Sequence, residues 1–226
     1  MKQNVIAIDG PAGAGKSTVA KKVAETLGFV YIDTGAMYRA VTSCVLDQKL
    51  SPDDVTGISD LAQRISVRFT YGAGGLRVQV DGTDLTESIR TPEVTAAVPK
   101  VSQIPAVRHA MLRLQREMAA DGKVVLDGRD IGTVVVPEAC TKIFLTASPQ
   151  ERARRRWQEM KDKGYDQDLF SLQVEMEQRD RQDSERELAP LVQASDAVLV
   201  DTTGLSIEAV VTTIVEIYRS QCNFHV

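Results

Sequence analysis

The stretch NVIAIDGPAGAGKST (residues 4–18) decides the fold of this chain. The apolar run VIAI (5–8) comes directly before a glycine-rich segment, and after Lys16 apolar residues recur at helical spacing until Gly28. A strand, a glycine-rich turn and a helix in this order place backbone N–H groups and a helix N-terminus around an anion. Residues 10–17 match the pattern G-x-x-x-x-G-K-[ST] in full, so we expect the loop to hold the phosphate chain of a nucleotide.

The loop also predicts individual contacts to that nucleotide. We expect Lys16 to reach the β and γ phosphates, and the Ser17 hydroxyl to ligate Mg²⁺. No guanine-reading N-K-x-D pattern occurs in the chain, which argues against a GTPase. The expected ATP-binding residues are Gly10, Pro11, Ala12, Gly13, Ala14, Gly15, Lys16, Ser17 and Thr18. The alternative is a plain glycine-rich turn, and the buried strand and amphipathic helix on either side argue against it.

Short apolar runs separated by helical patterns predict an α/β fold with a five-stranded parallel sheet flanked by helices. The runs are continuous rather than alternating, as in strands buried on both faces. They are VIAI (5–8), FVYI (29–32), VVL (124–126), KIFLTA (142–147) and AVLV (197–200).

Two regions depart from this pattern. ISVRFTY (65–71) and LRVQV (76–80) alternate apolar and polar residues around GAGG, which predicts an antiparallel hairpin, with a third short strand after DGT (81–83). Residues 151–187 are dense in charge, with nine basic and eleven acidic residues, and indicate a solvated helical pair. We therefore expect one domain, residues 1–226. Its parts are a core (1–59, 96–150 and 188–226), a β insertion (about 60–95) and a charged helical lid (about 151–187).

Composition excludes several classes of protein. The net charge of −4 argues against a nucleic-acid partner, and no apolar run is long enough for a membrane span or a secretory signal. The two histidines, His109 and His225, argue against a histidine-based triad or metal site, and we expect both to be structural or exposed. The three scattered cysteines favour a reducing, cytoplasmic environment over a disulfide or a zinc site.

Arginines and carboxylates follow two of the expected strands and indicate an acceptor for the phosphate. Strand 29–32 ends in DTGAMYR (33–39) and strand 124–126 ends in DGRDIGT (127–133). Ligands of open parallel sheets bind beyond the carboxyl ends of the strands, and Arg39 and Arg129 suit an anionic acceptor there. A small kinase is therefore favoured over a nucleotide-dependent switch, which would hydrolyse ATP slowly and change partners.

Further stretches occur in order along the chain: GPAGAGKST, YIDTGAMYR, IRTPEV, VVLDGRDIGTVV, KIFLTAS, the RxxxR of ERARRRW, and RDRQDSEREL with APL after it. Together they resemble the bacterial cytidylate kinase family over about residues 5–215. The resemblance implies the nucleoside-monophosphate kinase fold, in which an inserted sheet serves the acceptor and a helical lid closes over ATP. It also implies transfer of the γ-phosphoryl group of ATP to CMP or dCMP by a cytoplasmic enzyme, which we expect to be a monomer. Kinases of another monophosphate or a small metabolite stay as alternatives.

The resemblance carries an acceptor site onto this sequence. Its contacts fall on Thr34, Tyr38, Arg39, Arg108, Arg129, Asp130, Arg179, Asp183 and Arg186. It implies that Arg108 and Asp130 meet the base, that Asp183 and Arg179 meet the sugar, and that Arg39, Arg129 and Arg186 face phosphate. This chain departs from the family at Pro99, where a serine often helps to read the base, and Ser102 is a neighbour that would compensate. The alternative role for Asp130 is only to orient Arg129.

Catalysis by alignment and charge neutralisation fits this set, because a nucleoside monophosphate is already an anionic nucleophile. We expect the catalytic residues to be Lys16, Arg129, Arg152 and Arg156. Arg152 and Arg156 stand at i and i+4 on one helix face and would cover the transferring group when the lid closes, with Arg155 as a substitute for either. Asp33 and Asp127 end strands where they would hold the metal through water or cap local structure.

Overall fold

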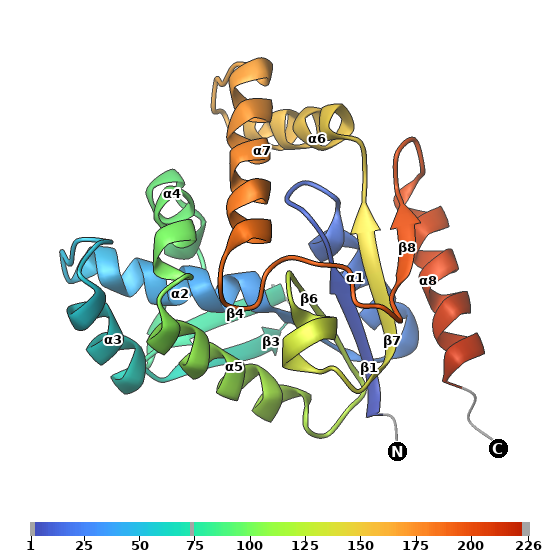
Figure 1. Cartoon of the computed structure of the whole chain (residues 1–226), viewed down its shortest axis with the longest axis horizontal. Helices are drawn as coiled ribbons and strands as arrows, with labels where there is room; N and C mark the ends of the chain where they lie inside the picture. The colour runs from blue at the N-terminus through green and yellow to red at the C-terminus, as the bar shows by residue number, and fades with distance from the viewer. Residues whose placement is uncertain (1–2, 73–74, 223–226) are drawn as a thin grey trace. The chain divides into compact units, whose positions relative to one another are not determined.

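A computed structural model describes residues 3–72 and 75–222 of the chain (Figure 1). His225 and the middle of the GAGG turn lie outside the described residues. The chain divides into two compact units: the first comprises Met1–Asp33 and Ala119–Val226, and the second Thr34–Met118. Within the described part of the chain, no helix combines the length and the apolar character that crossing a membrane requires.

The first unit contains the predicted five-stranded sheet. Its strands are β1 (Gln3–Asp9), β2 (Val30–Asp33), β6 (Val124–Gly128), β7 (Ala139–Thr146) and β8 (Val198–Asp201). They lie in the order β2-β6-β1-β7-β8, and every neighbouring pair is parallel. All five expected strands and the α/β class are therefore confirmed. The order places the carboxyl ends of β1 and β6 side by side, with Asp9 opposite Gly128 and Ile8 opposite Asp127.

Helices α1 (Lys16–Leu27) and α8 (Ile207–Gln221) share one core with this sheet (Figure 1). Val19 and Val23 of α1 and Ile214 of α8 are almost fully buried there, as the helical spacing of their apolar residues predicts. Gly28 ends α1 in the left-handed conformation, where its N–H bonds to the last turn, so the predicted stop is confirmed. Helix α1, which begins at Lys16, is therefore held in place by its packing against the sheet and α8.

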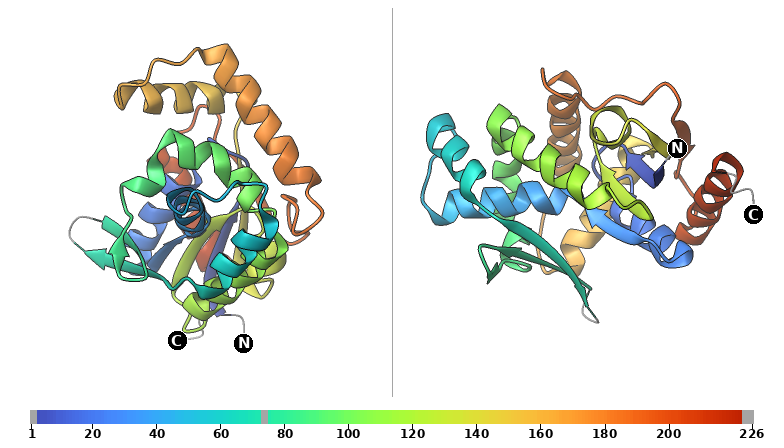
Figure 2. Two further views of the ribbon diagram at one scale, coloured as in Figure 1. Left: turned by 90° about the vertical axis from the view of Figure 1, so that its left-hand side faces the viewer. Right: turned by 90° about the horizontal axis from the view of Figure 1, so that it is seen from below.

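The charged segment forms two helices, α6 (Pro149–Asp162) and α7 (Leu169–Glu185). They pack against one another, and Figure 2 shows the short connection that joins them. Ser148 caps α6 and Asp168 caps α7, each by accepting a backbone N–H three residues on. Exposed ion pairs run along α6, as the charge pattern predicts, including Lys163 with Glu159 four residues earlier. A single π-helical turn, η2 (Ile131–Val135), follows β6.

The second unit has a core of its own and a separate antiparallel sheet, ordered β3-β4-β5. Asp81 and Gly82 both have positive φ and form the two-residue turn between β4 and β5, which confirms the short third strand. The predicted insertion, about 60–95, lies inside this unit. Its elements are α2 (Thr34–Asp47), α3 (Val55–Arg64), β3 (Val67–Gly72), β4 (Gly75–Val80), β5 (Thr83–Asp84), η1 (Ser88–Arg90), α4 (Pro92–Val101) and α5 (Pro105–Ala119).

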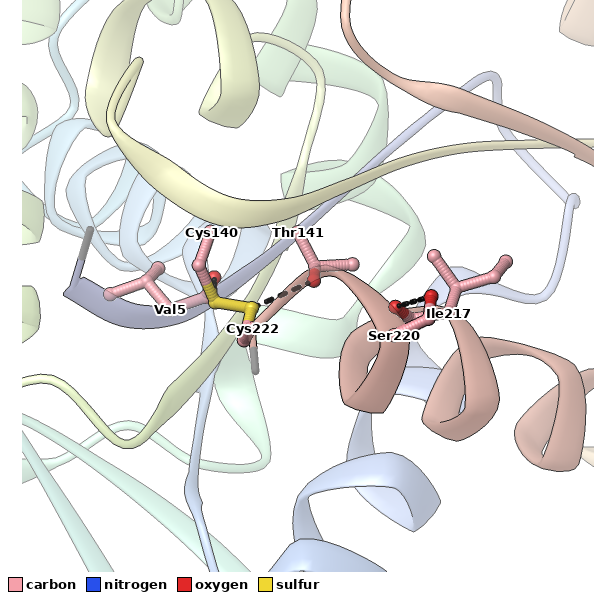
Figure 3. Close-up of a disulfide and its surroundings, with 6 residues drawn as sticks. All are labelled: Val5, Cys140, Thr141, Ile217, Ser220 and Cys222. Atoms are coloured by element: carbon pink, nitrogen blue, oxygen red, sulfur yellow. Dashed lines mark hydrogen bonds between the residues drawn. A yellow bond between two sulfur atoms is a disulfide. The ribbon is translucent and has the colours of Figure 1, made fainter. Parts of the chain in front are cut away.

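The expectation that the three cysteines form no disulfide is wrong. Cys140 of β7 and Cys222 at the end of α8 form a disulfide across 82 residues of sequence, with their Cα atoms 5.9 Å apart (Figure 3). The Thr141 hydroxyl lies 3.3 Å from the Cys222 sulfur and donates to it, because a disulfide sulfur carries no hydrogen (Figure 3). Nothing in the sequence indicated this disulfide, because its two cysteines are far apart in the chain and meet only where the end of α8 lies beside β7 in the fold. Cys44, in the second unit, is a free thiol.

Candidate active site

The glycine-rich loop between β1 and α1, here called the donor loop (residues 10–18), is shaped by close backbone contacts. Gly10 has a φ of 147°, and a Cβ at this position would lie 2.0 Å from the carbonyl oxygen of Leu145. Gly13 has a φ of 73°, and its Cβ would lie 2.9 Å from the carbonyl oxygen of Arg152. Both positions therefore require glycine, and the loop lies tightly between β7 and the start of α6.

Lys16 lies buried in the first turn of α1, and its Nζ donates to the carbonyl oxygen of Pro11 at 2.7 Å. Burial and the positive charge of Arg129 hold the pKa of Lys16 well below its ordinary value; Arg179 adds to the decrease and Asp127 opposes it. The Lys16 ammonium group therefore lies in the field of two other positive side chains, Arg129 and Arg179. Such a site gains most from binding a polyanion, which restores the favourable environment for Lys16.

Ser17 and the end of β6 form the expected metal-binding side of the loop. The Ser17 hydroxyl donates to Asp127 at 2.8 Å, and the Tyr31 hydroxyl donates to the other oxygen of Asp127 at 2.9 Å. Burial raises the pKa of Asp127 to about 6, and the nearby charge of Asp33 adds to this shift. One hydroxyl and one carboxylate, with water and phosphate oxygens, suit Mg²⁺, which binds few protein ligands. The described residues contain no ready cluster of three metal-binding side chains.

Asp9 joins the end of β1 to the turn after β6. Its two oxygens accept the backbone N–H groups of Ile131 and Gly132 at 2.8 and 2.7 Å. Burial raises the pKa of Asp9 to about 6 against these two hydrogen bonds, which lower it. The carboxylate therefore fixes the segment that begins with Arg129 and Asp130 relative to the donor loop.

The nine residues that the family resemblance implies for acceptor binding are here called the acceptor set. Those in the first unit form a connected charge network. Arg129 pairs with Asp183 at 2.8 Å, and Arg186 pairs with Asp130 at 3.1 Å and with Asp183 at 3.7 Å. The Asp183 carboxylate raises the pKa of Arg129 against the effect of burial, and Arg129 in turn holds the pKa of Asp183 below its ordinary value. Arg179 is half-buried on α7 and contributes positive charge to Asp183 and Lys16.

The remaining acceptor-set residues belong to the second unit. Arg108 of α5 lies over the Tyr38 ring of α2, with 5.7 Å from the guanidinium carbon to the ring centroid. Its Nη1 donates to the carbonyl oxygen of Ser102, whose hydroxyl donates to the carbonyl oxygen of Pro99, both at 3.3 Å. Ser102 therefore holds Arg108 through its backbone. Thr34 is buried at the start of α2, and Arg39 is half-buried one turn later.

Each arginine of α6 that was expected at the phosphoryl group has protein partners in this structure. Arg152 is buried and donates to the carbonyl oxygens of Ala147 and Ala12 at 3.1 and 3.0 Å. Arg156 pairs with Glu159 at 2.8 Å near the surface. Arg155 donates to the Thr202 hydroxyl and carbonyl, both at 2.8 Å, and its Nη1 lies 3.8 Å from the Cβ position at Gly15. Arg152 and Arg155 therefore line the donor loop.

Known proteins match this chain along nearly its whole length. The family model for cytidylate kinase matches residues 6–220. The chain belongs to the cytidylate kinase family. The cytidylate kinase of Carboxydothermus hydrogenoformans is 53% identical over 212 residues, covering 94% of this chain and 96% of the relative. The cytidylate kinase of Desulforamulus reducens is 54% identical over 210 residues, covering 93% and 94%.

A solved structure of an uncharacterized protein from Eubacterium ventriosum has the same general fold. It superposes with a TM-score of 0.54 at 16% identity, covering 97% of this chain and 99% of that one. At this identity the likeness shows the fold alone.

The structure brings Lys16, Arg129 and Arg179 into one electrostatic neighbourhood within the first unit, and it joins Tyr38 to Arg108 within the second. Sequence reasoning missed three site-lining residues: Asp9, Tyr31 and Asp180. Asp9 had a local signal, because it is a carboxylate that directly follows the buried run VIAI. The other two contact residues far away in the sequence and had none.

Proposed function

We propose that this member of the cytidylate kinase family transfers the γ-phosphoryl group of ATP to CMP or dCMP, giving ADP and CDP or dCDP. The observation that carries the proposal is the match of the cytidylate kinase family model to residues 6–220, and the positive charges of Arg129 and Arg179 that act on the buried Lys16 support it. These arginines come from acceptor-set segments, while Lys16 belongs to the donor loop. A phosphoryl group in transit between two anionic nucleotides needs positive charge from both sides.

The acceptor phosphate is an anionic nucleophile at neutral pH, so the reaction requires no strong general base. Lys16 neutralises charge on the β and γ oxygens, and the N–H groups of the donor loop hold the phosphate chain in line. Arg129 meets phosphate on the acceptor side and is itself held by Asp183. A fixed guanidinium loses little entropy when the substrate arrives, which favours catalysis by alignment.

Mg²⁺ fits the donor side through Ser17 and Asp127, whose oxygens lie 2.8 Å apart. When bound, the ion neutralises charge on the phosphate oxygens. Tyr31 keeps the second oxygen of Asp127 occupied, so the carboxylate is oriented toward Ser17. This arrangement supports Ser17 and Asp127 as the residues that would hold a hydrated Mg²⁺ ion.

Arg152 and Arg156 complete the proposed catalytic set. Arg152 already lies against the donor loop through Ala12. Arg156 stands one turn further along α6 and would exchange Glu159 for the phosphoryl group when the lid closes over ATP. Closure excludes water and so prevents simple hydrolysis of ATP.

Base reading rests on Asp130 and Arg108. Cytosine presents an N4 amine donor beside its N3 and O2 acceptors, so a carboxylate would suit the amine and a guanidinium would suit the two acceptors. Uracil presents O4 to Asp130 instead, and that unpaired contact costs on the order of 1–3 kcal/mol, about tenfold to a hundredfold in selectivity. The backbone support of Arg108 by Ser102 favours this role despite Pro99.

The cellular setting is proposed as cytoplasmic and the enzyme as a monomer. ATP as the donor supports a cytoplasmic location, whereas the Cys140–Cys222 disulfide is of a kind that is rare there. Thiol labelling of the enzyme from freshly lysed cells would show whether the pair is oxidised in vivo. Sedimentation at several protein concentrations would test the monomer.

A coupled assay of ADP release tests the activity. CMP, dCMP, UMP and AMP are each supplied with ATP and Mg²⁺, and one reaction contains no acceptor. We expect fast turnover with CMP and dCMP, slower turnover with UMP, and little without acceptor. Equal turnover without acceptor would instead make the protein an ATP-hydrolysing switch, and a preference for AMP or UMP would point to another monophosphate.

A further inference from the structure

Asp180 of α7 contacts the donor loop directly. Its Oδ1 accepts the backbone N–H of Ala12 at 3.0 Å. Its Oδ2 pairs with Nη1 of Arg152, and the same nitrogen donates to the carbonyl oxygen of Ala12 at 3.0 Å. Both polar backbone groups of one loop residue are therefore bound by a single ion pair that joins α6 to α7.

This contact lies in a packed environment. Its side chains are largely buried, with 9% of Arg152 and 17% of Asp180 exposed. Ala12 packs with Leu172 and Met176 of α7 in a small apolar cluster. Hydrogen bonds between charged groups are stronger where water is excluded, so the ion pair holds the loop and both helices in one arrangement.

Asp180 also stands among the acceptor-set residues. Arg179 precedes it, and Asp183, which pairs with Arg129, follows within one turn of α7. One turn of one helix thus carries a contact to the donor loop and contacts expected at the acceptor. A shift of this turn moves both sets together.

We propose that Asp180 is a positioning residue, which holds Ala12 and Arg152 so that the loop N–H groups and the guanidinium meet the γ-phosphate in a fixed arrangement. The inference rests on the proposed function. Without the carboxylate, Arg152 keeps two neutral acceptors but loses its charged partner. An amide at this position leaves a single acceptor oxygen for both the Ala12 N–H and Arg152. Misplacement by about 1 Å is enough to cost on the order of a hundredfold in rate.

The test compares Asp180→Asn with Glu177→Gln as its matched control. Glu177 lies exposed one turn earlier on α7, where it accepts a hydrogen bond from Gln173. The two variants remove the same charge from the same helix. We expect Asp180→Asn to lower kcat roughly tenfold to a hundredfold, with KM for ATP changed less than kcat, and Glu177→Gln to stay within twofold of wild type.

A purely structural role predicts a different result. Asp180→Asn would then lower the melting temperature and leave kcat per folded enzyme unchanged, which overturns the proposal. Asp180→Glu keeps the charge, and recovery of part of kcat in this variant supports positioning by the carboxylate. If Asp180→Asn fails to fold, Asp180→Ser takes its place and is read in the same way: a kcat per folded enzyme within twofold of wild type overturns the proposal, and a larger loss supports it.

A double-mutant cycle sharpens the result. Asp180→Asn and Arg152→Lys act on one ion pair, so their combined loss of kcat should fall short of the product of the single losses. A combined loss of kcat equal to the product of the two single losses would contradict the proposed coupling between Asp180 and Arg152. Failure of the proposed function is distinct, because the wild-type enzyme would then show no CMP-dependent ADP release.

Discussion

The donor loop and the acceptor set differ in how the chain builds them. The donor loop is nine consecutive residues, shaped by glycines whose positions no other residue fits and completed by Lys16. The acceptor set comes from five separate stretches, at residues 34–39, 108, 129–130, 179 and 183–186, and is divided between the two compact units. In the proposed function, the phosphate chain of ATP would therefore bind largely to the backbone of one segment, and the acceptor largely to charged side chains of several segments.

This difference has consequences for mutation. A backbone site is lost when the chain cannot adopt the loop, whereas a side-chain site is altered one contact at a time. Changes in the donor loop should therefore abolish turnover with every acceptor. Changes in the acceptor set should alter which acceptor is preferred.

The largest effect is expected for Lys16→Ala. Loss of the buried ammonium removes charge neutralisation from the transferring phosphoryl group, and kcat should fall roughly 10²- to 10³-fold with CMP and dCMP alike. The coupled assay with both acceptors measures it. Lys22→Ala is the control, because Lys22 lies on the same helix but pairs at the surface with Glu208. If the ratio of kcat with CMP to kcat with dCMP changes in Lys16→Ala, the donor loop also affects acceptor choice, and the two sites do not act separately.

The next effect is expected for Asp130→Asn. The CMP:UMP ratio of kcat/KM should fall about tenfold to a hundredfold, since the amide no longer distinguishes an amine from a carbonyl as a carboxylate does. kcat should also fall, because Asp130 pairs with Arg186. Asp121→Asn, at an exposed position, provides the control. An unchanged ratio would assign Asp130 to holding Arg186 alone.

Asp9→Asn tests whether the Asp9 carboxylate, which joins the end of β1 to the turn after β6, makes the stability of the protein depend on pH. The pKa of Asp9 in the folded protein, about 6, lies above its ordinary value of 3.8. The folded state therefore binds the proton more tightly, and this contribution to stability is full below pH 3.8 and lost as pH rises through 6.

The shift corresponds to roughly 3 kcal/mol at most, at about 1.36 kcal/mol per pKa unit. The free energy of unfolding of the wild type should therefore fall more steeply between pH 4 and 6.5 than that of Asp9→Asn. Urea titrations at several pH values measure the difference in slope. Parallel profiles for the two proteins would show that Asp9 does not titrate in this range.

The smallest effect on activity is expected for Cys222→Ser, which lies in neither site. Loss of a cross-link over 82 residues removes up to about 4.5 kcal/mol of stability in the chain-entropy model. The melting temperature should fall, and kcat at 25 °C should stay within twofold. Wild-type enzyme treated with a reductant should match the variant. A lower kcat in both the variant and the reduced wild type would show that the disulfide at the end of α8 affects the donor loop, through the packing of α8 against α1.

The features predictable from sequence were local ones. The five strands, the donor loop and the stop at Gly28 are each encoded within a few neighbouring residues, so periodicity and glycine positions were enough. The disulfide, the Tyr31–Asp127 bond and the Asp180–Ala12 bond join residues 82, 96 and 168 positions apart. Only the order of strands and helices in the folded sheet brings these residues together. The roles in the acceptor set came from family resemblance and stay predictions.

The conformation and close contacts of Gly13 restrict which substitutions the donor loop can accept during evolution. A side chain there would meet the methyl group of Met176 at 2.6 Å and the Arg152 carbonyl at 2.9 Å, in a backbone conformation that favours glycine. A smaller residue at 176 relieves only the first clash. A library randomised at both positions should therefore recover variety at 176 and glycine alone at 13. A side chain at position 13 would require both a displaced α6 and a different backbone conformation.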